Sequence, residues 1–170
     1  MFGIDIFCDA SVVNLFGNVM ANKAVCVGAY GYYIPSMNRY KVDVIKNVNA
    51  SLVNYCELKA FYKTLVECHR MTNKGVVRIH TDANYVFHSI NKMIQLKQLM
   101  GKVPESFYDN VPCKKSIKLY RKIAEFDFES IFVLKVKAHM NKKQPKYQAN
   151  NCIDQKVVSV ARQHKKQFVA

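Results

Sequence analysis

The 170-residue sequence lacks the features that would place it in a membrane or outside the cell. No apolar run approaches the roughly 20 residues that a membrane-spanning helix requires. The start, Met-Phe-Gly-Ile-Asp-Ile, has no basic segment and soon reaches two aspartates, unlike a secretory signal peptide. We therefore expect a cytoplasmic protein in a reducing compartment, with no membrane partner.

The chain also lacks the cysteine spacing of a zinc-binding protein. Its six cysteines are widely scattered and include no C-x-x-C pair. Without a secretory signal, disulfides are not expected either. The cysteines are therefore predicted to be small buried hydrophobic residues.

Acidic residues are scarce, since 12 Asp and Glu stand against 26 Lys and Arg, for a formal charge of +14. Such an excess favours a polyanionic partner. Nucleic acid is preferred over a membrane surface because no segment combines a basic and an apolar face. Lysines concentrate in residues 114–122, 135–146 and 162–166, where they predict phosphate contacts without specifying the nucleic acid.

Internal repeats, low-complexity segments and convincing linkers are absent too, so residues 1–170 are predicted to form a single domain. Half of the residues are hydrophobic, including ten Phe and ten Tyr, which excludes a disordered chain and provides for a substantial core. No extended apolar heptad indicates a dimer, and we expect a monomer.

The first half of the chain predicts three strands and a helix. Residues 3–8, 23–33 and 39–48 have the alternation and β-branched residues of strands, and short connections make them an antiparallel meander. Over residues 54–72, apolar side chains recur at helical spacing. Glu57 is expected in the first turn of this helix, where a Glu is commonly only a partner of the helix dipole.

A second strand-to-helix junction follows. Residues 75–80, a short segment rich in β-branched side chains, predict a strand that delivers Asp82 to its carboxyl end, before a helix that begins at Asn84. The preceding helix is then a crossover, which places its strands parallel. Asp82 or Asn84 is available as the N-cap of the second helix, so Asp82 taken alone has a purely structural interpretation.

The rest of the chain predicts a short excursion with a loop, then a helix, a strand, a polar loop and a final helix. In order, these occupy residues 96–111, 112–126, 130–137, 141–151 and 152–167. Asp154 is expected in the first turn of the last helix. The carboxyl edge of an α/β sheet is where ligands and metals usually bind, so acidic residues at several element ends are candidates for one site.

With its motifs in this order, the chain resembles type 1 ribonuclease H over nearly its whole length. The supporting segments are Ile-Phe-Cys-Asp9-Ala-Ser, Asn54-Tyr-Cys-Glu57-Leu-Lys-Ala, His-Thr-Asp82-Ala-Asn84-Tyr-Val, Val-Lys-Ala-His139 and Asn150-Asn-Cys-Ile-Asp154. The resemblance implies a ribonuclease H-like α/β fold. In that fold a five-stranded mixed sheet, three antiparallel strands and then two parallel ones, is flanked by helices.

The resemblance also implies a chemistry for the acidic residues. Asp9, Glu57, Asp82 and Asp154 would bind two Mg²⁺ or Mn²⁺ ions that hydrolyse the RNA strand of an RNA/DNA hybrid. Mg²⁺ prefers hard oxygen ligands, and two such ions can activate a water and stabilise the leaving oxygen. His139 matches the mobile histidine of the family, which assists proton transfer and product departure.

Polar residues in the same motifs are candidates for substrate contacts. Asn54 and Asn84 occupy positions where the family contacts RNA 2′-hydroxyls and backbone, the feature that separates RNA from DNA. Asn150 matches an asparagine close to the metal. Ser11, two residues after Asp9, is a further candidate.

Two departures from the family pattern are evident. The usual Asp-Gly-Ser turn reads Asp9-Ala10-Ser11 here, without the glycine. The chain has no Trp and therefore no Trp-rich basic handle, for which Lys92, Lys97 and Lys102 are a reduced substitute.

Other functions of the same fold fit less well. Proofreading-type exonucleases carry a D-x-E pair on the first strand, where this chain has Asp9-x-Ser11, and integrase-like enzymes end with a helix glutamate, where it has Asp154. The alternative from another class is a non-catalytic module that binds hybrids or duplexes. It leaves the presence of all four carboxylates and the histidine unexplained.

Overall fold

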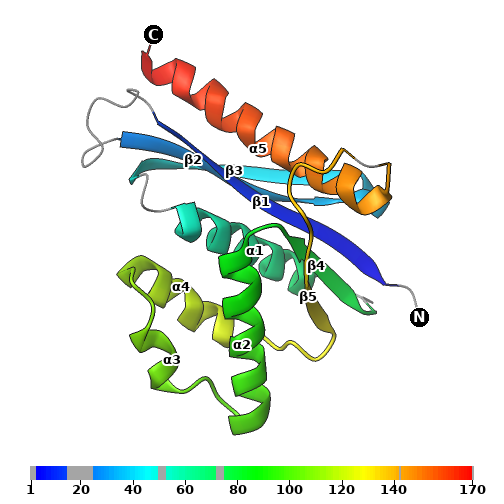
Figure 1. Ribbon diagram of the computed structural model, residues 1–170, viewed down its shortest axis with the longest axis vertical. Coiled ribbons are helices and arrows are strands. Elements are labelled where there is room, and N and C mark those ends of the chain that lie inside the picture. The colour runs from blue at the N-terminus through cyan, green and yellow to red at the C-terminus, as the bar shows by residue number, and fades with distance from the viewer. Residues whose placement is uncertain (1–2, 15–24, 50–52, 72–74, 142, 170) are drawn as a thin grey trace.

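The computed structural model describes residues 3–14, 25–49, 53–71, 75–141 and 143–169. Figure 1 shows the arrangement of the elements. In chain order they are β1 (Ile4–Asn14), β2 (Val25–Ile34), η2 (Pro35–Met37), β3 (Arg39–Asn49), α1 (Val53–Arg70), β4 (Val77–Thr81), α2 (Asn84–Met100), α3 (Glu105–Asp109), α4 (Lys114–Ala124), β5 (Ile131–Lys135) and α5 (Pro145–Val169).

The strands form one five-stranded sheet in the order β3-β2-β1-β4-β5. β1 pairs antiparallel with β2, and β2 pairs antiparallel with β3. β4 runs parallel to both of its neighbours, β1 and β5. The predicted mixed sheet, with three antiparallel strands and then two parallel ones, is therefore confirmed.

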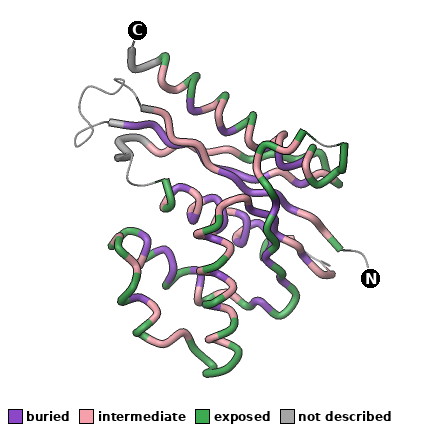
Figure 2. Tube along the Cα trace, viewed as in Figure 1, coloured by how far each residue is buried: buried purple, intermediate pink, exposed green. Residues whose placement is uncertain are grey.

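The helices divide between the two faces of the sheet (Figure 1). α1, α2 and α4 build the larger core on one face, where Phe61, Ile90 and Tyr120 are fully buried. α5 lies alone on the other face, where its Ile153 packs with Phe7 of β1. Figure 2 shows buried residues along the centre of the sheet and on the helix sides that face it.

β1 serves both cores because successive side chains of a strand point to opposite faces. Ile6 and Cys8 belong to the core under α1, and Phe7 belongs to the core under α5. Asp9 follows on the Phe7 side and is only 2% exposed. The alternation that builds the core therefore buries a carboxylate.

β1 is longer than predicted. It runs beyond Cys8 to Asn14, because β2 pairs with it as far as that residue. Its pairing with β4, in contrast, ends where Cys8 lies opposite Thr81. Asp9 is thus the first β1 residue beyond the parallel pairing with β4. It is not at the end of β1 itself, because the pairing with β2 continues to Asn14.

α2 also extends further than predicted, through the first part of the segment 96–111. It ends at Met100, where Gly101 adopts a φ of 75°. Glycine takes this left-handed conformation without a steric penalty, which makes it a common helix terminator. The expected short helix in this segment is α3, which begins after Pro104.

The predicted polar loop over residues 141–151 is wrong in its second half. α5 begins at Pro145 rather than near Cys152. Proline suits the first turn of a helix because its fixed φ is helical and its missing N–H needs no partner there. Ala149 of this early turn is buried against the sheet, so tertiary packing stabilises a helix that its polar composition did not indicate.

Among the described residues, no helix is both long and apolar enough to cross a membrane.

Candidate active site

The acidic residues converge on one cleft of about 460 Å³, at the edge of the sheet where β4 ends and α2 begins. Its walls come from β1, the beginning of α1, the junction between β4 and α2, the segment after β5, and α5. The residues lining it are Asp9, Ala10, Val53, Asn54, Glu57, Asp82, Ala83, Asn84, Tyr85, Ala138, His139 and Asp154.

Three of the four predicted carboxylates form a compact group. One oxygen each of Asp9, Glu57 and Asp82 can be chosen so that all three lie within 4.8 Å of one another. Asp9 comes from β1, Glu57 from α1 and Asp82 from the residue after β4. Asp154 lines the same cleft from α5 but lies outside this closest group.

The simpler structural interpretations of these residues do not hold. Asp82 does not cap α2, because the N-cap position is Ala83, whose N–H is bonded to the Thr81 hydroxyl at 3.2 Å. Glu57 lies four positions beyond Val53, the start of α1, and α1 has no acidic residue in its first turn. The predicted first-turn placement of Glu57 is therefore wrong.

The predicted first-turn placement of Asp154 is wrong as well. It lies nine positions beyond Pro145, where α5 begins. Since the effect of a helix dipole falls off within the first turn, neither Glu57 nor Asp154 is placed by an N-terminal dipole. Both are placed by the packing of their helices on the sheet.

Burial and mutual repulsion raise the pKa values of the grouped carboxyls. Burial, followed by the charge of Asp82, raises the pKa of Asp9 to about 8. Burial and then the charges of Asp9 and Asp82 hold the pKa of Glu57 well above its usual range. Burial also raises the pKa of Asp82, although a hydrogen bond from Asn150 opposes that shift. Ionised together, these groups therefore need a cation.

The same group leaves buried oxygens without a donor. Asp9 Oδ2, Glu57 Oε2 and Asn150 Oδ1 are buried and accept no hydrogen bond from the described residues. A buried polar atom without a partner is destabilising and calls for an ion or water. Three hard oxygen donors of this kind fit a magnesium or manganese ion.

His139 lies beside the fourth carboxylate. Its Nδ1 is 3.7 Å from Asp154 Oδ2. The imidazole is 76% exposed, and the residue has a φ of 52°, a left-handed conformation uncommon for a residue with a side chain. The histidine is thus held at the rim of the cleft by its backbone and faces solvent.

The structure brings three of the four substrate-binding candidates to the site. Asn54 and Asn84 line the cleft and are exposed there. Asn150 is buried on α5 and donates from Nδ2 to Asp82 Oδ2 at 3.3 Å. Ser11 lies on β1 opposite Ala29 of β2 and does not line the cleft.

The geometry and chemistry of this cleft agree with the sequence comparisons. A sequence model of the RNase H family matches residues 4–162. The chain belongs to the RNase H family. Membership makes it a ribonuclease H, in a family that generally depends on divalent metal ions.

Solved structures share the RNase H fold at low sequence identity. The solution structure of the PFV RNase H domain matches with a TM-score of 0.66 and 17% identity, over 94% of both chains. LC11-RNase H1, isolated from compost by a metagenomic approach, matches with a TM-score of 0.58 and 14% identity, over 96% of this chain and 99% of its own.

A third match is the foamy viral protease-reverse transcriptase in complex with RNA/DNA hybrid, with a TM-score of 0.60 and 15% identity. It covers 95% of this chain and 20% of the viral chain, so this RNase H spans about a fifth of that protein's length. A search of curated protein sequences found no match.

Two contacts at the site of this RNase H are not evident from its motifs. Lys135, the last residue of β5, donates from Nζ to the main-chain carbonyl of Asp82. Tyr85, next to Asn84, lines the cleft and packs edge-on against Tyr120. Only the strand register, which places Lys135 opposite Thr81, explains the lysine contact.

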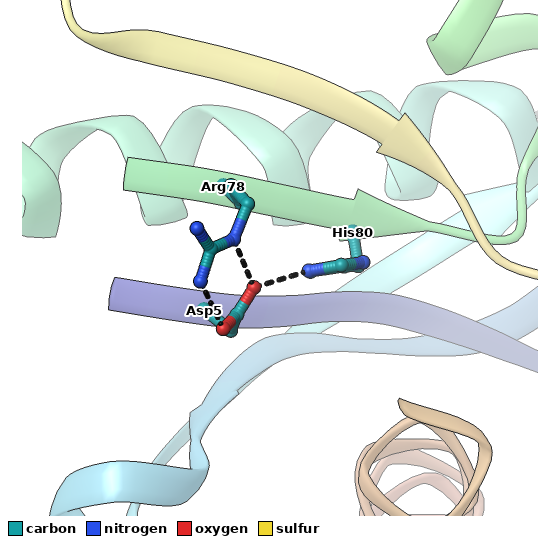
Figure 3. Close-up of polar contacts among 3 residues, drawn as sticks. All are labelled: Asp5, Arg78 and His80. Carbon is teal, nitrogen blue, oxygen red and sulfur yellow. Dashed lines mark hydrogen bonds and ion pairs between the residues drawn. The ribbon is translucent and has the colours of Figure 1, made fainter. Parts of the chain in front are cut away.

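A second polar cluster, on the parallel strands β1 and β4, has a structural role (Figure 3). Arg78 donates from Nε and Nη2 to the two carboxylate oxygens of Asp5, both at 2.7 Å. His80 Nε2 lies 2.8 Å from Asp5 Oδ1, and its ring stacks on Phe7 at 4.3 Å. The Arg78 hydrogen bond lowers the pKa of Asp5 to about 2. The contact of His80 with Asp5 and its stacking on Phe7 therefore explain the position of this histidine without a catalytic role.

Proposed function

We propose that this RNase H is an endonuclease that cleaves the RNA strand of RNA/DNA hybrids with two divalent cations, Mg²⁺ or Mn²⁺. The observation that carries the proposal is the group of Asp9, Glu57 and Asp82, whose nearest oxygens lie within 4.8 Å. Two of these carboxylates bury an oxygen that accepts no hydrogen bond from the part of the chain that the structure describes. A site that only bound a nucleic-acid backbone would have no use for them.

In this proposal the four carboxylates hold the cations. Asp9, Glu57 and Asp82 would supply the closest group of oxygens, and Asp154, which lines the same cleft from α5, would add a ligand. Held by these residues, two divalent ions would supply the activation of the attacking water and the stabilisation of the leaving 3′ oxygen. Asn150 orients Asp82 through its hydrogen bond and thereby fixes which carboxylate oxygen faces the cleft.

His139 is proposed to carry a proton at the rim of the site. Its exposed ring has Nδ1 toward Asp154, so Nε2 is available to the solvent and to the substrate. An imidazole is the side chain best suited to accept or donate a proton at neutral pH. Asp154, whose Oδ2 lies 3.7 Å from Nδ1, limits the orientation of the ring.

The remaining polar side chains are proposed to hold the hybrid. Asn54 and Asn84 present amides on the cleft wall, where they can bond to 2′-hydroxyls of the RNA strand. Lysines on the exposed side of α4, among them Lys114, Lys115 and Lys118, contact the phosphates of either strand. The hybrid complex of the foamy viral relative is consistent with such a substrate.

The decisive experiment incubates a labelled RNA/DNA hybrid with the protein and Mg²⁺, with EDTA as the metal-free control. We expect cleavage of the RNA strand with Mg²⁺ and none with EDTA. Asp82→Asn should abolish cleavage but leave hybrid binding nearly intact, because the carboxylate holds metal rather than phosphate. A protein that binds hybrids but cleaves none under any metal would instead support the non-catalytic binding module.

A further inference from the structure

We propose that Lys135 is a positioning residue of the metal site: its ammonium group fixes the main chain at Asp82 and partly compensates the carboxylate charge, in competition with the divalent ions. This inference rests on the proposed function, because it concerns the same carboxylates. It goes beyond that function in assigning a built-in cation to the site.

Strand register brings the lysine to Asp82. β5 runs parallel to β4, and its last residue, Lys135, lies opposite Thr81, the last residue of β4. The next residue, Val136, continues the pairing by donating its N–H to the Thr81 carbonyl at 3.0 Å. The Lys135 ammonium then donates to the following carbonyl, that of Asp82. Two successive carbonyls at the end of β4 are therefore held from β5.

The positive charges near the site are placed unequally. Burial and the charge of Asp154 raise the pKa of Asp82. The hydrogen bond from Asn150 and the positive charges of Lys135 and His139 act in the opposite direction. Asp9 and Glu57 face mainly other carboxylates, and their buried oxygens Oδ2 and Oε2 have no donor among the described residues. Lys135 thus compensates negative charge near Asp82, while the negative charge of Asp9 and Glu57 requires an added cation.

A fixed ammonium next to a divalent-ion site has two opposite effects. Before metal binds, it relieves repulsion among the carboxylates and stabilises the folded chain. Once metal binds, it repels the incoming positive charge. Because Lys135 is exposed, water screens both effects, and Coulomb interactions of this kind change a binding constant roughly three- to tenfold.

The test compares wild type with Lys135→Met, which removes the charge but keeps a similar length, and with Lys135→Arg, which keeps the charge. Lys41→Met, which replaces an exposed lysine of β3 that is outside the cleft, controls for general loss of charge. Mg²⁺ affinity is measured by isothermal titration calorimetry, and the melting temperature is measured in EDTA and in saturating Mg²⁺.

We expect Lys135→Met to melt at a lower temperature in EDTA, to bind Mg²⁺ roughly three- to tenfold more tightly, and to regain stability in saturating Mg²⁺. Lys135→Arg and Lys41→Met should resemble wild type in Mg²⁺ affinity and in melting temperature. Equal loss of melting temperature with and without Mg²⁺, at unchanged or weaker affinity, would overturn the proposal and leave Lys135 a purely structural contact.

The two proposals fail in different ways. If wild type binds Mg²⁺ and cleaves hybrids while Lys135→Met matches it in affinity, only the role of Lys135 is overturned. If wild type shows neither Mg²⁺ binding nor cleavage, the proposed function is overturned, and the role of Lys135 with it.

Discussion

Nδ1 of His139 and Oδ2 of Asp154 lie 3.7 Å apart, and they join a left-handed residue after β5 to the third turn of α5. His139 lies in the connection that follows β5, and Asp154 lies on the helix that packs on the sheet. Their proximity is therefore a property of the folded molecule, and it gives the exposed imidazole one charged neighbour that limits its orientation.

Replacement of His139 by Ala should lower the rate of hybrid cleavage by roughly 10- to 1000-fold, in or below the range of general acid–base catalysis. Mg²⁺ affinity should change little, since the proposed metal ligands are the carboxylates and not the histidine. His88→Ala is the matched control, because His88 is exposed on α2 and does not line the cleft. Equal rates for His139→Ala and wild type, in single-turnover and steady-state assays, would leave the histidine without a catalytic role.

Without metal, the protein should lose stability as the pH rises from about 4 to about 8. The pKa of Asp9 rises from its usual value of 3.8 to about 8 in the folded state, so the folded chain holds a proton that the unfolded chain releases in this window. The contribution of this proton to the free energy of unfolding is fully present below the window and is lost above it. Urea unfolding in EDTA at about pH 5 and about pH 9 measures the difference.

Asp9→Asn provides the control for that pH dependence. The amide cannot ionise, so the variant should be more stable than wild type at high pH in EDTA and should show a smaller change of unfolding free energy with pH. Saturating Mg²⁺ should reverse the order, because only wild type gains from metal binding. A wild-type unfolding free energy that is flat or rising between these pH values in EDTA would contradict the expected protonation.

Binding of the hybrid should weaken steeply with salt, with about 0.7 to 0.9 units of logarithmic slope for each phosphate neutralised. Lys118→Gln should lower the slope by about one such unit and weaken RNA/DNA and DNA/DNA binding equally, since phosphate contacts carry no sugar information. Lys63→Gln is the control, because Lys63 is half-buried in an ion pair with Asp43. A wild-type slope near zero would show that the +14 charge does not contact the substrate.

Asn84→Ala should reduce affinity or cleavage rate chiefly on duplexes that contain an RNA strand, because the lost partner is a 2′-hydroxyl or its neighbouring backbone. Asn54→Ala, which changes a second asparagine that lines the cleft, should have the same effect. The measurement is binding to hybrid and to plain DNA duplex, with Asn110→Ala, exposed and outside the cleft, as the control. Equal losses on both duplexes would mean that the asparagines do not read the sugar.

The order of strands and helices could be predicted from the sequence because the relevant signals are local. Alternation along β1, the β-branched run of β4 and the helical stripe of α1 each depend on neighbouring residues. The proximity of Asp9 and Asp82 could be predicted from the parallel pairing of β1 and β4. Each of the two residues directly follows the last paired residue of its strand.

What local patterns did not reveal depends on tertiary contacts. The polar first turns of α5 are helical because Ala149 packs against the sheet, which moves Asp154 away from the helix start. Lys97, a candidate for the substrate handle, instead donates to the carbonyls of Ala124, the last residue of α4, and of Phe126 just after it. Lys135 meets Asp82 only through the parallel register of β4 and β5, which no short motif encodes.

The position of α5 at the end of the element order also determines when activity can begin during synthesis. Asp9, Glu57 and Asp82 leave the ribosome first, but Asp154 and the layer that packs against Phe7 follow only after Pro145. A nascent chain arrested before α5 therefore has three carboxylates and an uncovered sheet face. We expect such a chain to be inactive, so that nuclease activity appears only after α5 has been translated and has docked.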